Sequence, residues 1–303
     1  MTDLRSSDPR YSLRGLWLPL VTPFRDGELD EASLRRLVRH YVPQPVNGLV
    51  LAATTGESLT LESCETERLV VTVRDEADRS RNLPLCLGLS GSNTRALLDT
   101  LDMTAGWPID GYLISCPYYS RPSQRGMELH FGALADRAAH PVMLYNIPYR
   151  TGVNLGNEAM LRLAGHPNIA GLKDCCANRD QSLDLLRRRP DNFAVLTGED
   201  AQYLEALSDG ADGGILASAH VETGTFAEIQ NLLAAGERAG ALANGCRSHA
   251  AAVCRAEPGA DQVLAVAQRI DRERGGSAAD DGSQPRTRRP SRSGNRTASL
   301  ASW

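Results

Sequence analysis

Residues 168–176 read NIAGLKDCC, and this stretch decides how the whole chain is interpreted. It holds Lys173, the only lysine in a chain with 33 basic residues. Arginine can form ion pairs and bind anions, but only a primary amine can form a Schiff base with a carbonyl group. Lys173 also ends an apolar run, residues 169–172, that has the composition of a buried strand. The position therefore predicts either a catalytic amine or a lysine whose stem packs while its amine reaches solvent.

Other short apolar runs resemble the one that Lys173 ends, and helical patterns separate them. Strands are expected at residues 15–21, 48–52, 84–89, 111–116, 141–145, 169–173, 193–197 and 213–216. Helices are expected from residue 30 or 31 to about 38, and at about 63–77, 93–105, 123–137, 160–164, 200–208 and 223–235, with Asp200 as a cap. Alternation of this kind predicts parallel βα units, and eight strands predict a (β/α)8 TIM barrel. An open doubly wound sheet is the alternative, but it would require a GxGxxG or Walker A motif that the chain does not contain.

The composition of the chain changes beyond the predicted barrel. Residues 1–235 are expected to form the barrel catalytic domain, and residues 236–274 an atypical C-terminal helical extension. Residues 275–303 are rich in arginine, serine and proline, so we expect them to be disordered. A shifted reading frame would also produce such an abrupt change, and resequencing the gene would test that hypothesis.

Charge and cysteine usage limit the class of protein. A net charge of −4 gives no sign of a nucleic-acid partner or an anionic membrane. No apolar run approaches the length of a membrane span, and the polar start lacks the core of a signal peptide. The seven cysteines show no CxxC pair, and the six histidines show no HxH or HExxH spacing. We therefore expect a cytoplasmic protein without a metal site.

Polar residues follow several of the predicted strands. Side chains at the C-terminal ends of barrel strands surround one pocket, so these residues are expected to meet there. They are Thr54, Thr55, Tyr118, Tyr119, Tyr145, Arg150 and Lys173. His220 follows the eighth strand and could face the same pocket, although a structural role is the more common one for such a histidine.

These residue types suit an amine-dependent aldolase. Lys173 would attack the ketone of a 2-oxo acid, and the resulting iminium would let the adjacent carbon lose a proton. Tyr145 could pass protons through the hydroxyl of Thr54. Thr55 and loop amides could bind the 2-oxo acid carboxylate, and Arg150 could bind a carboxylate on the acceptor.

Four motifs resemble the dihydrodipicolinate synthase and N-acetylneuraminate lyase family of pyruvate-dependent class I aldolases. They are Ala53-Thr54-Thr55-Gly56-Glu57, residues 116–119 with Arg121-Pro122, residues 145–152 (YNIPYRTG), and residues 171–173. The resemblance implies a barrel with a C-terminal helical extension, with Lys173 as the Schiff-base lysine and Tyr145 as the proton-transferring phenol. It also implies a homodimer or homotetramer in which Thr54 and the partner's Tyr119 complete a proton relay.

Substrate expectations also follow from the resemblance. It implies that Thr55 binds the pyruvate carboxylate, that Gly198 and Ile215 line the pyruvate pocket, and that Arg150 holds the carboxylate of L-aspartate 4-semialdehyde. The leading prediction is condensation of these two substrates to 4-hydroxy-tetrahydrodipicolinate, a step of diaminopimelate and lysine biosynthesis. This reaction is expected to need no metal and no organic cofactor, because pyruvate itself becomes the electron sink. Ala53 and residues 217–220 depart from the usual synthase pattern. Two alternatives stay open: a pyruvate-dependent lyase or deaminase acting on a sugar acid or a hydroxyproline-derived compound, and a non-catalytic barrel that binds 2-oxo acids.

Overall fold

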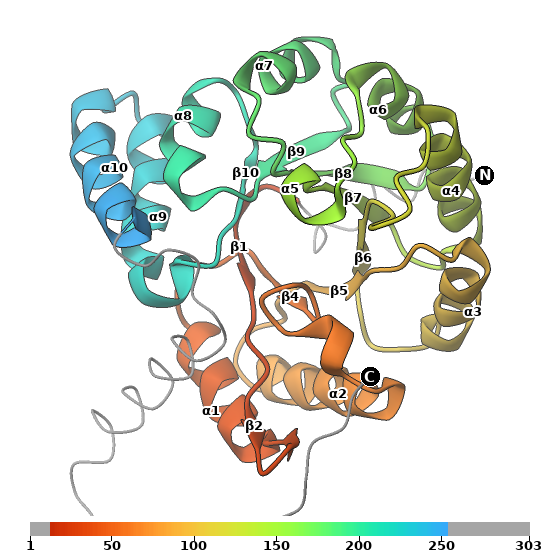
Figure 1. Cartoon of the computed structure of the whole chain (residues 1–303). Helices are drawn as coiled ribbons and strands as arrows, with labels where there is room; N and C mark the ends of the chain where they lie inside the picture. Colours follow the sequence, from red (N-terminus) through yellow and green to blue (C-terminus); the bar gives the residue numbers. More distant parts are fainter. Residues whose placement is uncertain (1–12, 254–303) are drawn as a thin grey trace, which may run out of the picture.

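The computed structural model describes residues 13–253 and gives only the backbone of residues 246–253. Eight parallel strands close into a barrel in the order β1-β10-β9-β8-β7-β6-β5-β4, and helices surround it (Figure 1). The barrel strands are β1 (Gly15–Pro19), β4 (Gly48–Leu51), β5 (Leu85–Leu89), β6 (Gly111–Ser115), β7 (Val142–Asn146), β8 (Ile169–Asp174), β9 (Ala194–Thr197) and β10 (Gly213–Ile215). The structure thus confirms the predicted (β/α)8 barrel, and each predicted strand agrees with an observed one to within two residues.

Helices cover the outside of the barrel and connect its strands. They are α1 (Glu31–Tyr41), α2 (Ser63–Asp78), α3 (Thr94–Thr104), α4 (Gln124–Arg137), α5 (Pro148–Thr151), α6 (Asn157–Ala164), α7 (Arg179–Arg188), α8 (Tyr203–Ser208), α9 (Ala219–Ala234) and α10 (Arg238–Val253). Two 3₁₀ turns, η1 (Ser58–Thr60) and η2 (Asp200–Gln202), and a hairpin of β2 (Phe24–Arg25) with β3 (Glu28–Leu29) complete the fold. Asp30 and Asn93 cap α1 and α3 through their side chains.

Two features of the helices differ from the sequence prediction. The prediction gave no bounds for α7, in which only Leu185 is buried. Asp200 was predicted to cap the helix that follows it, but it begins η2 and makes no side-chain cap of α8. Its Oδ1 instead accepts a hydrogen bond from the backbone N–H of Ser218, at 3.0 Å. The Asp200 carboxylate therefore joins the loop after β9 to the start of α9.

The core has two layers because successive residues of each strand face opposite sides of the barrel wall. The larger layer lies between strands and helices, and Leu172 of β8 belongs to it. The smaller layer fills the interior of the barrel and includes Trp17, Tyr145 and Ile215. Gly48 makes room for the indole, since a Cβ at Gly48 would come within 2.3 Å of the Trp17 ring. Lys173 follows Leu172, so it belongs to the inward-facing set.

The C-terminal part of the described chain packs on the outer helices of the last barrel units. Helix α10 contacts α9 and α8 and is drawn in blue in Figure 1. This helix falls within the predicted extension of residues 236–274. The remainder of that extension beyond residue 253, and the tail of residues 275–303, lie outside the described residues.

Candidate active site

Lys173 lies near the C-terminal end of β8, and its side chain is only 6% exposed. Its Nζ lies 4.5 Å from the centroid of the Tyr145 ring, on the neighbouring strand β7, where the two residues are register partners. Burial lowers the pKa of the Lys173 amine, and Arg150 lowers it further, while the carboxylates of Asp200 and Glu199 oppose the shift. A lowered pKa increases the share of neutral amine, which is the nucleophilic form.

Tyr145 and Thr54 are brought together from β7 and from the loop after β4. Burial raises the pKa of the Tyr145 phenol well above its usual value, and a hydrogen bond with the Thr54 side chain partly offsets this effect. The phenol is buried, whereas Thr54 is exposed. The pair therefore forms a hydrogen-bonded link from the interior of the barrel to its surface.

Tyr119 is placed differently. Its side chain is 94% exposed, and its backbone has a left-handed φ of 66°. Its backbone N–H donates to the carbonyl of Thr151 at 3.2 Å, which ties the loop after β6 to α5. Within this single chain the Tyr119 phenol thus faces outward, away from the buried amine.

Gly198 borders Lys173, whereas Ile215 lies in the interior of the barrel. A Cβ at Gly198 would lie 2.5 Å from Lys173 Cε and 2.2 Å from Cys175 Sγ, so the lysine stem and the thiol pack directly on this glycine. Ile215 ends β10 and belongs to the same interior cluster as Tyr145 and Cys175. Both predicted pocket residues therefore lie in or beside the interior layer of the barrel.

Arg150 and Thr55 lie at the outer end of the site. Arg150 is exposed on α5, and its guanidinium carbon lies 5.7 Å from the centroid of the Tyr149 ring. Its charge lowers the pKa values of both Tyr145 and Lys173, though it is the last of several causes, after burial. Thr55 is half-buried and directly follows Thr54.

The loop that holds Thr54 and Thr55 also contains Ala53, which stands where the family motif has its first glycine. The left-handed residues of this loop are Ala52 and Glu57, with φ of 47° and 55°, and Ala53 has no positive φ. Alanine in place of the first glycine of the motif therefore causes no backbone strain at residue 53.

Sequence reasoning missed several residues of this site. Glu199 accepts hydrogen bonds from the Tyr149 hydroxyl, at 3.1 Å, and from the Cys175 thiol. Burial raises the pKa values of Asp200, Cys175 and Tyr149. The available signal was the acidic pair Glu199-Asp200 directly after the seventh strand, at the same end of the barrel as Lys173.

Asp174 and His220 lie near the site in surroundings that indicate structural roles. Asp174 follows Lys173 and accepts hydrogen bonds from the Cys176 N–H, at 3.0 Å, and from the Ser182 hydroxyl, at 2.6 Å, so it orders the start of α7. His220 packs edge-on against Tyr41 of α1, with ring centroids 5.3 Å apart, and burial lowers the pKa of its imidazole to about 4. Neither environment indicates a role in proton transfer to a substrate.

Among residues 13–253, no group of histidine, cysteine, aspartate and glutamate side chains is arranged to hold a metal ion. The same part of the chain has no helix that is both long and apolar enough to span a membrane.

A (β/α)8 barrel with a buried amine beside a phenol at its strand ends defines the class, that of barrel lyases and aldolases. The chain belongs to the dihydrodipicolinate synthetase family, whose model matches residues 12–251. It is 42% identical over 219 residues to 4-hydroxy-tetrahydrodipicolinate synthase 2 of Clostridium acetobutylicum, covering 72% of this chain and 76% of the relative.

Solved structures give the same result. A dihydrodipicolinate synthase of Bacillus anthracis superposes with a TM-score of 0.81 at 30% identity, over 86% of this chain and 89% of that one. A structure described as the first monomeric dihydrodipicolinate synthase variant superposes with a TM-score of 0.78 at 25% identity, over 86% of this chain and 97% of that one. The predicted fold and family are thus both confirmed, whereas the roles of individual site residues remain predictions.

Proposed function

We propose that this enzyme condenses pyruvate with L-aspartate 4-semialdehyde to 4-hydroxy-tetrahydrodipicolinate, in the pathway to diaminopimelate and lysine. The observation that carries the proposal is the buried amine of Lys173, 4.5 Å over the ring of Tyr145. Relatives at 34–42% identity that bear the name of this synthase support it.

The reaction begins when the neutral Lys173 amine attacks the ketone carbon of pyruvate. Loss of water gives an iminium, which draws electrons from the neighbouring methyl carbon, and that carbon loses a proton to become an enamine. These steps move protons on and off oxygen and carbon, and the hydrogen-bonded pair of Tyr145 and Thr54 can carry them. Because its pKa is raised, the Tyr145 phenol is protonated at rest, so it takes up a proton again after each transfer.

The enamine carbon then attacks the aldehyde carbon of the acceptor, and the aldehyde oxygen takes a proton to become a hydroxyl. The amino group of the acceptor attacks the iminium carbon, closes the ring and displaces Lys173. No external oxidant or reductant is needed, because the aldehyde carbon is reduced to the alcohol level while the former methyl carbon is oxidised by the same amount. The free amine is thus restored for the next cycle.

Two carboxylates must be held during these steps. Thr55, beside Thr54 in the loop after β4, is proposed to bind the pyruvate carboxylate together with loop amides. Arg150, exposed at the outer end of the site, is proposed to bind the acceptor carboxylate with its planar fork. Gly198 leaves the space in which the lysine stem lies.

A homo-oligomer is also part of the proposal. The Tyr119 phenol faces outward, and the backbone of Tyr119 is left-handed, a conformation that costs energy. A partner subunit that buries the phenol could offset this cost. Sedimentation of wild type and Tyr119→Ala would test this, since a wild-type monomer with full activity would contradict it. Free thiols at Cys64, Cys86, Cys116, Cys175 and Cys176 support action in the reducing cytoplasm.

Borohydride reduction in the presence of pyruvate tests the chemistry directly. Because Lys173 is the only lysine, a single intact-mass gain that Lys173→Met abolishes would assign the adduct. Absence of a pyruvate adduct in the folded wild type would identify a non-catalytic barrel. A third outcome is an adduct with no turnover of the semialdehyde but with turnover of a sugar acid or a hydroxyproline-derived substrate. That outcome would assign the enzyme to another activity of the family.

A further inference from the structure

A hydrogen bond crosses the mouth of the barrel above the catalytic strand. The hydroxyl of Tyr149, in α5 directly after β7, donates to Oε1 of Glu199, directly after β9, at 3.1 Å. In the barrel β8 lies between β7 and β9. A link from the β7 loop to the β9 loop must therefore pass over the end of β8, where Lys173 lies.

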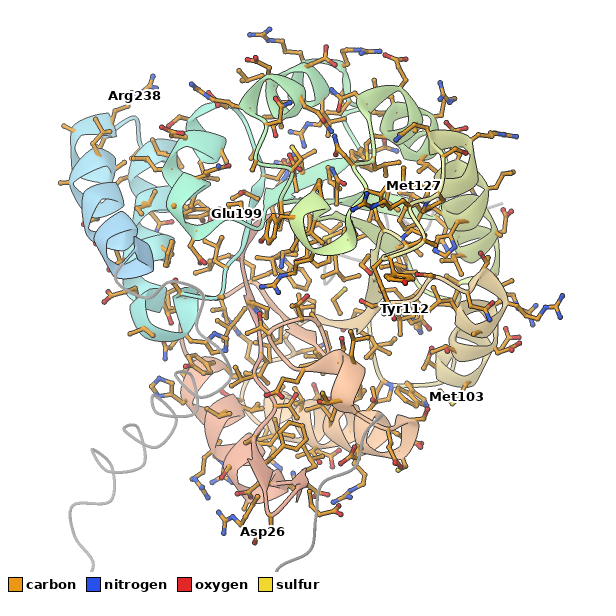
Figure 2. The ribbon with its side chains drawn as sticks, viewed as in Figure 1. Asp26, Met103, Tyr112, Met127, Glu199 and Arg238 are labelled. Atoms are coloured by element: carbon orange, nitrogen blue, oxygen red, sulfur yellow. The ribbon has the colours of Figure 1, made fainter. Side chains whose placement is uncertain are left out.

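The acceptor end of this link is held in place. The backbone N–H of Glu199 donates to the Thr197 side chain at 3.2 Å, and its carboxylate also accepts from the Cys175 thiol. Figure 2 shows Glu199 inside the ring of helices, close to α5. The carboxylate is therefore a fixed anchor for the phenol.

The same tyrosine also supports Arg150. The guanidinium carbon lies 5.7 Å from the centroid of the Tyr149 ring, within the range of a cation–π contact. Since Tyr149 and Arg150 are neighbours on a helix of only four residues, pinning the phenol limits the positions that the guanidinium can adopt. Fixing a donor before the substrate arrives reduces the entropy that binding costs.

We propose that Tyr149 is a specificity-determining residue that restricts the enzyme to short acceptors ending in a carboxylate. This inference rests on the function proposed above. The hydrogen-bonded pair of Tyr149 and Glu199 joins the segments on either side of β8, so it would restrict the space beside Lys173 that a longer, polyhydroxylated acceptor needs. The contact between Tyr149 and Arg150 keeps the cation that would bind the acceptor carboxylate beside this pair.

The test compares Tyr149→Ala and Tyr149→Phe in the full-length protein. Leu129→Ala on α4 is the matched control, since Leu129 is 59% exposed and Tyr149 is 56% exposed. Tyr149→Ala should raise the KM for L-aspartate 4-semialdehyde about 5-fold, the value of one cation–π contact, while pyruvate trapping by borohydride stays unchanged. It should also cleave 2-keto-3-deoxygluconate about 10-fold faster than wild type, the gain expected when about 1.4 kcal/mol of steric exclusion is removed.

The phenylalanine variant separates the two effects of the tyrosine. Tyr149→Phe keeps the ring beside Arg150 but loses the hydrogen bond to Glu199 that fixes it, so the semialdehyde KM should rise less than in Tyr149→Ala while sugar-acid cleavage increases. If Tyr149→Ala does not fold, Tyr149→Phe decides alone, and unchanged sugar-acid cleavage overturns the inference. Wild-type kinetics in both variants would also overturn it. A wild type that traps no pyruvate overturns the proposed function, and this inference with it.

Discussion

Substitution of Gly198 by alanine tests the packing that places the catalytic amine. The new Cβ would lie 2.5 Å from Lys173 Cε and 2.2 Å from Cys175 Sγ. Carbon atoms in contact are about 3.5–4.0 Å apart, so the lysine stem must retreat by roughly 1 Å. Gly198 has no positive φ, so the effect of alanine is steric and does not arise from the backbone.

The expected magnitude follows from this displacement. Overpacking of this kind costs about 1–3 kcal/mol of folding free energy, which lowers the Tm of a domain of this size by roughly 2 to 12 °C. A misplacement of about 1 Å can reduce the rate about 100-fold. The assay is the initial rate of pyruvate trapping, measured by intact mass below the Tm of the variant.

A matched control separates this effect from that of an added methyl group. Gly224 lies in α9, and a Cβ there would meet no atom within 4 Å. Gly224→Ala should therefore raise stability by about 1 kcal/mol and leave trapping unchanged. The double variant Cys175→Ala/Gly198→Ala removes the sulfur clash but keeps the clash with Lys173, so it should recover stability without recovering rate. Wild-type trapping in Gly198→Ala would refute the assigned position of the amine.

Three further predictions concern the roles of single residues. Tyr145→Phe should reduce turnover by about 10²- to 10⁴-fold, and steady-state kinetics would show it; a smaller loss would remove the phenol from the proton path. Arg150→Ala should abolish turnover of the semialdehyde but spare pyruvate trapping, and equal loss of both would contradict its role toward the acceptor. Lys173→Met should raise the free energy of unfolding at pH 7, measured in urea, because the lowered pKa means that burial makes the protonated amine less stable in the folded chain than in the unfolded one. This gain should shrink as the pH rises toward the ordinary pKa of lysine, and a gain independent of pH would refute the assignment.

The fold could be predicted from the sequence because each barrel strand is a short apolar run. Helix α7 shows no comparable apolar pattern, because Leu185 is its only buried residue and several of its other residues are charged. The hairpin of β2 and β3 was also missed, although Asp26 and Gly27, with φ of 54° and 86°, form the left-handed pair typical of a tight hairpin turn. Its strands have only two residues each, too few to show an alternating pattern.

The site was only partly predictable, for a different reason. Strand ends converge in a barrel, so Lys173 and Tyr145 could be placed together from their positions in the sequence. The contact of Tyr149 with Glu199 joins residues 50 positions apart on loops whose paths depend on tertiary structure. Tyr149 is also half-exposed, so no apolar pattern marks it.

The buried amine ultimately explains why these residues occur together. An amine in the barrel interior is costly as a cation, and burial accordingly lowers the pKa of Lys173. Purely structural packing would favour an apolar side chain there, because an apolar side chain has no charge to desolvate. The chain instead places its only lysine at this point, keeps Gly198 small beside it and puts the carboxylates of Glu199 and Asp200 nearby. This arrangement of a buried lysine costs stability, and the surrounding residues accommodate it. Chemistry that requires an amine explains both facts.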